Sequence, residues 1–280
     1  MRSSSGRPGR RSLAGYAALL AATLLGPMAD TTGTALAEPA APAGGGHASP
    51  RIVGGTETST ERYPWAVELT TDGDAPFCGG TLVAARKVVT AAHCVTTNGR
   101  PDPASSVRVV AGRTDMRSTA GSTVDVTRIW VHPRFTAATQ GFDVAVLTLA
   151  DALPYRTLPL VAAGDTASYR PGTMATVLGW GRTGENEPQS SRLRSVTVPI
   201  VADADCARAE PDFKSPAMVC AGDPRGGRDA CLGDSGGPMV VDGRLVGLVS
   251  WGEGCGRPGK PGVYARLATY HDDVAAQVNG

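Results

Sequence analysis

The sequence has no long apolar run and almost no excess of charge of either sign. The apolar stretch at residues 13–25 holds thirteen residues, whereas a helix needs about 20 to cross a bilayer. The net charge is +1 over 280 residues, which supplies no electrostatic reason to bind nucleic acid or a membrane surface. We therefore expect neither a nucleic-acid partner nor a membrane partner.

Closely spaced metal ligands are also missing. The six cysteines all lie from Cys78 onward, and they do not form the close pairs typical of structural zinc sites. We expect no metal and no cofactor. Cysteines that follow an export leader fit an oxidising compartment and a disulfide framework. Six cysteines allow fifteen pairings, however, and the spacing alone does not choose among them.

The first 51 residues do not have the pattern of a folded domain. Residues 1–37 have the features of a secretory signal peptide, because arginines precede the apolar stretch and an Ala-Leu-Ala cleavage site ends at residue 37. The pair Arg10-Arg11 matches a twin-arginine signal only weakly, so general secretory export is the default. Residues 38–51 are mostly alanine, proline and glycine and cannot bury a core. We expect a secreted, extracellular protein whose folded part is residues 52–280.

Strand breakers are abundant in the rest of the chain. Glycine and proline number 36 and 21, which favours short strands joined by frequent turns. No long helical crossover separates the β-rich runs, a pattern typical of antiparallel barrels. A looser stretch at residues 150–172 divides the runs into two sets, and one helix is expected at residues 268–278. The expected strands are residues 65–70, 80–90, 107–111, 124–131, 144–149, 173–180, 193–200, 217–221, 238–241, 244–251 and 262–267.

Residues 229–238, DACLGDSGGP, place a serine between glycines and carboxylates. A serine hydroxyl becomes a nucleophile only with a base to take its proton and an orienting group for that base. It also needs backbone donors for the oxyanion that forms on attack. The glycines allow the backbone to turn its amides outward, so Ser235 is a candidate nucleophile. Taken alone, the segment fits an ordinary surface turn equally well.

A base and its orienting group are present elsewhere in the chain. Of four histidines, only His93 follows an apolar run and adjoins a cysteine. Asp143 opens the apolar run of residues 144–149, so its carboxylate should be largely desolvated. A buried carboxylate beside an imidazole holds one tautomer and stabilises the imidazolium.

Three segments thus occur in the order His, Asp, Ser: VVTAAHC at residues 88–94, GFDVAVLTL at 141–149 and DACLGDSGGP at 229–238. In these segments the sequence resembles the trypsin-like serine proteases of the chymotrypsin fold. The resemblance extends from Ile52 to about Leu267. It implies an all-β fold of two antiparallel β-barrels with a C-terminal helix, and a site in the cleft between the barrels.

The resemblance assigns catalytic roles by residue. Ser235 is the nucleophile, His93 the general base and Asp143 the group that orients His93. The backbone amides of Gly233 and Ser235 form the oxyanion hole. Ser250 is a second hydrogen-bond partner near Asp143.

The resemblance also implies a preference for basic side chains. Asp229 forms the floor of the substrate pocket, where a carboxylate binds arginine or lysine. Trp251 belongs to the pocket, and Gly252 and Gly262 leave room for a long side chain. Ala230 stands where many trypsins have serine, so a lysine ammonium loses a partner that a bidentate guanidinium does not need. We expect arginine to be preferred over lysine.

Activation by cleavage is a further implication of the resemblance. The chain would be cut after Arg51, and the freed amino group of Ile52 would pair with Asp234 and order the oxyanion loop. The resemblance also selects one set of disulfides among the fifteen. These are Cys78–Cys94, Cys206–Cys220 and Cys231–Cys255.

The resemblance thins at two places. Arg113 and Thr123 occupy the positions where calcium-binding relatives have glutamates, so we expect no calcium there. The terminal helix lacks the tryptophan common in the family, which leaves its packing undetermined.

The leading interpretation is a secreted, monomeric serine endopeptidase, made as a zymogen, that cuts proteins or peptides after arginine and lysine through an acyl-enzyme. Proteinaceous protease inhibitors are expected partners. The main alternative is an inactive homologue that uses the same barrels as a binding module. A secreted esterase would share the chemistry, but Pro238 and a β-run follow the serine where an esterase has a helix.

Overall fold

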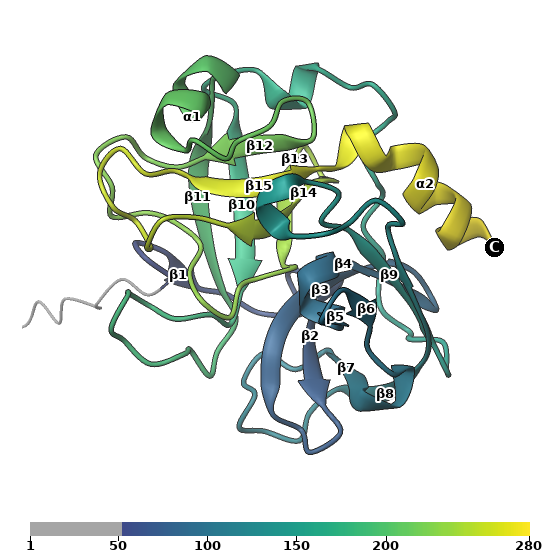
Figure 1. Ribbon diagram of the computed structural model, residues 1–280. Helices are drawn as coiled ribbons and strands as arrows, with labels where there is room; N and C mark the ends of the chain where they lie inside the picture. The colour runs from purple at the N-terminus through teal and green to yellow at the C-terminus, as the bar shows by residue number, and fades with distance from the viewer. Residues whose placement is uncertain (1–51) are drawn as a thin grey trace, which may run out of the picture. The chain divides into compact units, whose positions relative to one another are not determined.

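The computed structural model describes residues 52–280 (Figure 1). The predicted signal peptide, the predicted propeptide and Arg51 lie outside the described residues. The strands are β1 Thr56–Glu57, β2 Ala66–Thr71, β3 Pro76–Ala84, β4 Lys87–Thr90, β5 Thr96–Thr97, β6 Arg100–Pro101, β7 Val107–Ala111, β8 Ser122–Val131, β9 Ala145–Leu149, β10 Met174–Gly179, β11 Arg194–Val201, β12 Met218–Ala221, β13 Pro238–Val241, β14 Arg244–Trp251 and β15 Gly262–Arg266. The helices are α1 Asp203–Ala209 and α2 Leu267–Asn279, with short 3-10 helices at Ala92–Val95, Ala104–Ser106, Ala138–Gln140 and Ala167–Tyr169.

Six antiparallel strands close the first barrel in the order β2-β3-β4-β9-β8-β7. Val67 and Leu69 of β2 are buried in its interior, where a Cβ on Gly80 of β3 would come within 3.2 Å of both side chains. Because successive side chains of a strand point to opposite faces, Glu68 between them faces out of this barrel. A closed barrel leaves no strand edge unpaired.

The second barrel follows the order β11-β10-β13-β14-β15-β12, and pairing of β11 with β12 closes it. The short strand β1 pairs with β11. Strands of the first barrel run from blue to teal in Figure 1, and those of the second run from teal to yellow. The predicted all-β fold of two antiparallel barrels with a C-terminal helix is confirmed.

The sequence pattern did not reveal one turn, one α-helix and the three two-residue strands β1, β5 and β6. The predicted strand at residues 80–90 is part of a hairpin, because β3 ends at Ala84 and β4 begins at Lys87. The two residues between them are neither glycine nor proline, so composition did not mark the turn. Helix α1 has only seven residues, too few for an apolar period of 3.6 to be seen.

Helix α2 begins and ends one residue beyond the predicted range of 268–278. It packs through Tyr270 and Val274, which are 1% and 0% exposed. Tyr270 therefore anchors the helix, and the missing tryptophan does not leave it without a packed face. Within residues 52–280, no helix combines the length and the apolar character needed to cross a membrane.

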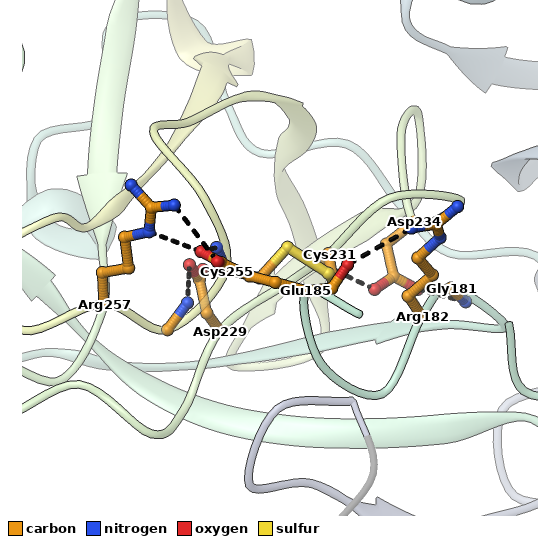
Figure 2. The surroundings of a disulfide bond; sticks show 9 residues. Gly181, Arg182, Glu185, Asp229, Cys231, Asp234, Cys255 and Arg257 are labelled. Carbon is orange, nitrogen blue, oxygen red and sulfur yellow. Dashed lines mark hydrogen bonds and ion pairs between the residues drawn. A yellow bond between two sulfur atoms is a disulfide. The ribbon is translucent and has the colours of Figure 1, made fainter. Parts of the chain in front are cut away.

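Three disulfide bonds join all six cysteines in the pairing that the resemblance implies. Cys78–Cys94 links β3 to the turn that carries His93. Cys231–Cys255 links the Ser235 loop to residues 254–257 (Figure 2). The bonded cysteines are 14 to 24 residues apart, and constraining loops of this length in the unfolded chain stabilises a protein by about 3 kcal/mol each.

Candidate active site

His93 and Asp143 form a hydrogen-bonded pair on the first barrel. The 3-10 helix after β4 carries His93, and the segment before β9 carries Asp143. The carboxylate of Asp143 accepts two bonds from His93, one from Nδ1 at 2.8 Å and one from the backbone N–H at 2.9 Å. Ser250 of β14 donates its hydroxyl to the same carboxylate at 2.5 Å. The structure thus brings together two predicted residues of the first barrel and one of the second.

The pair shifts the protonation of both of its members. Burial alone would raise the pKa of Asp143, but its hydrogen bond to His93, the charge of His93 and the bond from Ser250 together lower that pKa. Burial alone would lower the pKa of His93, but the hydrogen bond and charge of Asp143 outweigh it and raise the pKa. An ionised Asp143 holds the proton on Nδ1, which leaves Nε2 of a neutral His93 able to accept one.

Backbone strain beside Asp143 is held in place by helix α2. Phe142 has φ of +58°, an uncommon conformation for a bulky residue that costs on the order of 1–3 kcal/mol. Its N–H donates to the Tyr270 hydroxyl at 2.9 Å, and that hydroxyl donates to the Ala217 carbonyl at 2.9 Å. The guanidinium of Arg134 lies 4.0 Å from the centre of the Phe142 ring. Sequence reasoning missed the role of Tyr270, because nothing in the pattern of the helix marks it.

Ser235 reaches the first barrel through its backbone. Its carbonyl accepts a bond from the N–H of Gly79 in β3 at 2.8 Å. The next residue, Gly236, has φ of +74° and packs so closely that a Cβ would lie 2.2 Å from Oγ1 of Thr90. Only glycine fits there without strain. Since Thr90 is three residues before His93, this packing brings the serine segment to the turn that carries the histidine.

The loop before Ser235 presents free backbone donors. Gly233 has φ of +95°, and the amides of Asp234 and Gly237 are hydrogen-bonded to the carbonyls of Cys231 and Asp234. Among residues 52–280, by contrast, the amides of Gly233 and Ser235 have no protein acceptor. Two unpaired donors of this kind can stabilise an oxyanion.

Asp229 is a buried wall residue of a cavity of about 540 Å³. One carboxylate oxygen accepts the Gly256 N–H at 3.0 Å, and the other has no partner among the described residues. Burial raises the pKa of Asp229 to about 7, although the bond from Gly256 opposes the shift. A Cβ on Gly262 would lie 2.7 Å from the unpartnered oxygen. The same cavity is lined by six other residues predicted for catalysis or substrate binding, namely Ala230, Ser235, Ser250, Trp251, Gly252 and Gly262.

Asp234 is fully buried and lies between Gly233 and Ser235 in the same loop. Its carboxylate accepts the backbone N–H groups of Gly181 at 2.8 Å and Cys231 at 2.9 Å (Figure 2). Burial raises its pKa to about 7. A Cβ on Gly179 or Gly181 would lie 2.1 Å or 2.4 Å from the Asp234 carboxyl group. Sequence reasoning missed these two glycines, although the Gly-Trp-Gly run that begins at the last residue of β10 was a usable signal.

A second buried acid, Glu68, faces this region from β2. It is 0% exposed, and neither carboxyl oxygen has a hydrogen-bond partner among the described residues. Its neighbours across the strands are the uncharged Gly79 and Val110. Burial, reinforced by the charge of Asp234, raises the pKa of Glu68 well above its ordinary value, which favours the neutral acid.

Replacing Glu68 with glutamine should make stability less dependent on pH. The unfolded chain loses the Glu68 proton above the ordinary pKa of 4.5, whereas the folded chain keeps it until the raised pKa is reached. The wild-type free energy of unfolding therefore falls with rising pH, by up to about 1.4 kcal/mol per pH unit between the two values. Urea unfolding in a Ser235→Ala background, which prevents self-digestion, should show the advantage of Glu68→Gln growing from pH 4 to pH 8. An advantage that is the same at both pH values contradicts this.

The described residues contain one cluster of metal-ligand types, formed by Cys78, His93 and Cys94. The two cysteines are bonded to each other. Because the ligand form of cysteine is the thiolate, this disulfide supplies no cysteine ligand, and the cluster does not have the donors of a metal site.

Comparisons with known proteins find similar sequences over most of the described part of the chain. The family model described as Trypsin matches residues 52–274. The chain is similar to "Trypsin" of Saccharopolyspora erythraea, with 50% identity over 229 residues that cover 81% of this chain and 98% of that protein. It is 40% identical to "Trypsin eta" of Drosophila melanogaster, over 81% of this chain and 88% of that protein. It is 37% identical to "Trypsin-2" of Salmo salar, over 79% and 93% of the two chains.

Proposed function

Because the chain belongs to the trypsin family of serine proteases, and so is a serine endopeptidase acting on proteins or peptides, we propose that it cuts after arginine and, less readily, after lysine. The observation that carries this proposal is Asp229, a buried carboxylate with one unpartnered oxygen in the cavity that Ser235 also lines. A basic side chain supplies the missing cation through charge-assisted hydrogen bonds. The peptide bond that follows this side chain then lies at the serine.

The catalytic steps follow from the roles proposed for three side chains. Nε2 of His93 takes the proton of the Ser235 hydroxyl as Oγ attacks the substrate carbonyl carbon. Asp143 stabilises the imidazolium, and the amides of Gly233 and Ser235 bind the oxyanion. His93 then gives the proton to the leaving amine, which departs and leaves an acyl-enzyme. A water molecule, deprotonated by His93, then attacks the ester, and His93 returns the proton to Oγ as the Ser235 hydroxyl leaves and the acid product is released.

Matched peptides that differ only at the residue before the cut test the specificity. Protein cleaved between residues 51 and 52 should turn over arginyl peptides with a kcat/KM about tenfold above that of lysyl peptides. Ala230 provides no hydroxyl for an ammonium, and loss of such a hydrogen bond to a charged group costs about 1.5 kcal/mol or more. Glutaminyl peptides should be cut far more slowly than either. Equal turnover of arginyl and lysyl peptides contradicts the preference, and failure to cut either contradicts the proposed specificity.

Activation by cleavage after Arg51 belongs to the same proposal. In the uncut chain the nitrogen of Ile52 is an amide and carries no charge. Among residues 52–280, the buried carboxylate of Asp234 accepts hydrogen bonds from two backbone amides and from no other donor. The Ile52 side chain is 0% exposed, and the Val53 carbonyl accepts the Asp229 N–H at 3.1 Å. Cleavage would create an ammonium that pairs with Asp234, whose buried charge otherwise lacks compensation.

The proposed processing of the protein follows the order of the segments along the chain. Residues 1–37 act as a signal peptide, residues 38–51 as an activation peptide, and residues 52–280 as a secreted, monomeric protease domain open to proteinaceous inhibitors. The alternative of an inactive homologue that serves as a binding module is not favoured, because the chain keeps His93, Asp143 and Ser235.

A further inference from the structure

The loop between β10 and β11 is hydrogen-bonded to the segment that follows β14. Glu185, in that loop, accepts the backbone N–H of Cys255 at 3.0 Å and Nε of Arg257 at 2.5 Å on one carboxylate oxygen. Its other oxygen accepts Nη2 of Arg257 at 3.1 Å. Figure 2 shows the carboxylate of Glu185 facing the guanidinium of Arg257 beside the Cys231–Cys255 disulfide. A two-pronged contact of this kind fixes geometry as well as contributing energy.

Gly256, the residue between Cys255 and Arg257, is bound by the carboxylate of Asp229, the proposed specificity residue. The N–H of Gly256 donates to Asp229 at 3.0 Å, and the carbonyl of Gly256 accepts the N–H of Gly227 at 2.7 Å. Asp229 and Glu185 therefore bind consecutive amides, those of Gly256 and Cys255. Any shift of this segment moves the donor that orients Asp229.

Close packing leaves the side chains of Glu185 and Arg257 little freedom to move. Gly254 has φ of +79°, and a Cβ there would lie 2.1 Å from an oxygen of Glu185 and 2.4 Å from Nε of Arg257. Glu185 itself lines the cavity together with Asp229 and Ser235. Glu185 thus lines the cavity, and its carboxylate is bound to the segment whose Gly256 amide hydrogen-bonds to Asp229.

We propose that Glu185 is a positioning residue for Asp229: it holds residues 255–257 so that the Gly256 amide keeps the Asp229 carboxylate aligned for a basic side chain. This inference rests on the proposed function. The side chains of Glu185 and Arg257 are 34% and 50% exposed, and exposed ion pairs contribute little to stability. The role of the contact is therefore to align the cavity, and its loss should weaken substrate binding while leaving the chemical step intact.

Kinetics on an arginyl peptide test the proposal. Glu185→Ala removes every contact of the carboxylate and should raise KM about tenfold with kcat within about twofold, the pattern of lost uniform binding. Glu185→Gln keeps an oxygen for the Cys255 amide but loses the charge, and should raise KM by about threefold. The matched control is Asp125→Asn, which breaks the exposed Arg108–Asp125 pair of the first barrel and should change neither parameter.

Two further measurements separate this proposal from its premise. Calorimetric binding of benzamidine, a small aryl amidine, to Glu185→Ala in a Ser235→Ala background should weaken by the same factor as KM rises, and thermal unfolding should shift little. An unchanged KM and an unchanged amidine affinity overturn the positioning role while leaving the proposed specificity standing. A fall in kcat as large as the rise in KM also overturns it. Wild-type protein that does not cut arginyl peptides at all indicates failure of the proposed function instead.

Discussion

Replacing Ser235 with alanine should lower kcat on arginyl peptides by about a millionfold, the loss seen when the nucleophile of another serine protease is removed. Alanine leaves His93 and Asp143 hydrogen-bonded to each other but supplies no oxygen to attack the carbonyl. The backbone contact of Ser235 with Gly79 does not involve the hydroxyl, so the fold should be retained. Steady-state hydrolysis of a chromogenic arginyl peptide by the activated protein measures the effect.

A matched control keeps this result specific to the site. Ser106→Ala removes a partly exposed hydroxyl whose one hydrogen bond within the described residues is to the nearby Pro103 carbonyl, and it should leave kcat unchanged. A fluorophosphonate probe should label the wild type and Ser106→Ala but not Ser235→Ala. Activity that survives in Ser235→Ala would show that another group is the nucleophile.

Replacing Asp229 with asparagine should lower kcat/KM for arginyl peptides by two to four orders of magnitude. Leaving a buried charge without its partner costs about 3–5 kcal/mol, and here the uncompensated charge is that of the substrate. Asparagine keeps an oxygen for the Gly256 amide, so the cavity wall should stay in place. Labelling of Ser235 by the fluorophosphonate probe should persist, which separates a specificity defect from a catalytic one.

The control for Asp229 is another buried acid of the second barrel. Glu210 is 2% exposed and does not line the cavity, so Glu210→Gln should change kcat/KM by less than about threefold, because its charge acts on Asp229 only at a distance.

The pKa of Asp229 is raised to about 7 by burial, and only the ionised carboxylate attracts a cation. Amidine affinity in a Ser235→Ala background should therefore increase as pH rises through about 7, and this increase should vanish in Asp229→Asn. A pH-independent affinity in Ser235→Ala protein that retains Asp229 would contradict the assignment.

Much of the fold was predictable because its signals are local. Strands β7, β13 and β14 were predicted at their observed bounds, since each is a short, mostly apolar run between turn residues. The hairpin turn between Ala84 and Lys87 was not predicted, because its residues carry no turn chemistry. Local signals of composition therefore locate strands well and turns without glycine or proline poorly.

The candidate site divides in the same way. The segments around His93, Asp143 and Ser235 could be recognised from the residues within a few positions of each. The contribution of Tyr270 could not be recognised in this way, because this residue lies 128 positions from Phe142, whose amide donates a hydrogen bond to the Tyr270 hydroxyl. The contact of Glu185 with Arg257 could not be predicted either, since these residues are 72 positions apart in the sequence. Only the folded second barrel brings them together.

By itself, the sequence identified the family and the kind of chemistry, and it proposed candidate residues for that chemistry, because a nucleophile, a base and a pocket carboxylate are recognised by side-chain type and local spacing. Only the tertiary structure decided which carboxyl groups are buried without a partner, as Glu68 is, and which are aligned by neighbours, as Asp229 is. Burial and alignment depend on the elements that surround a group in space, and closure of the barrels brings these together from distant parts of the chain.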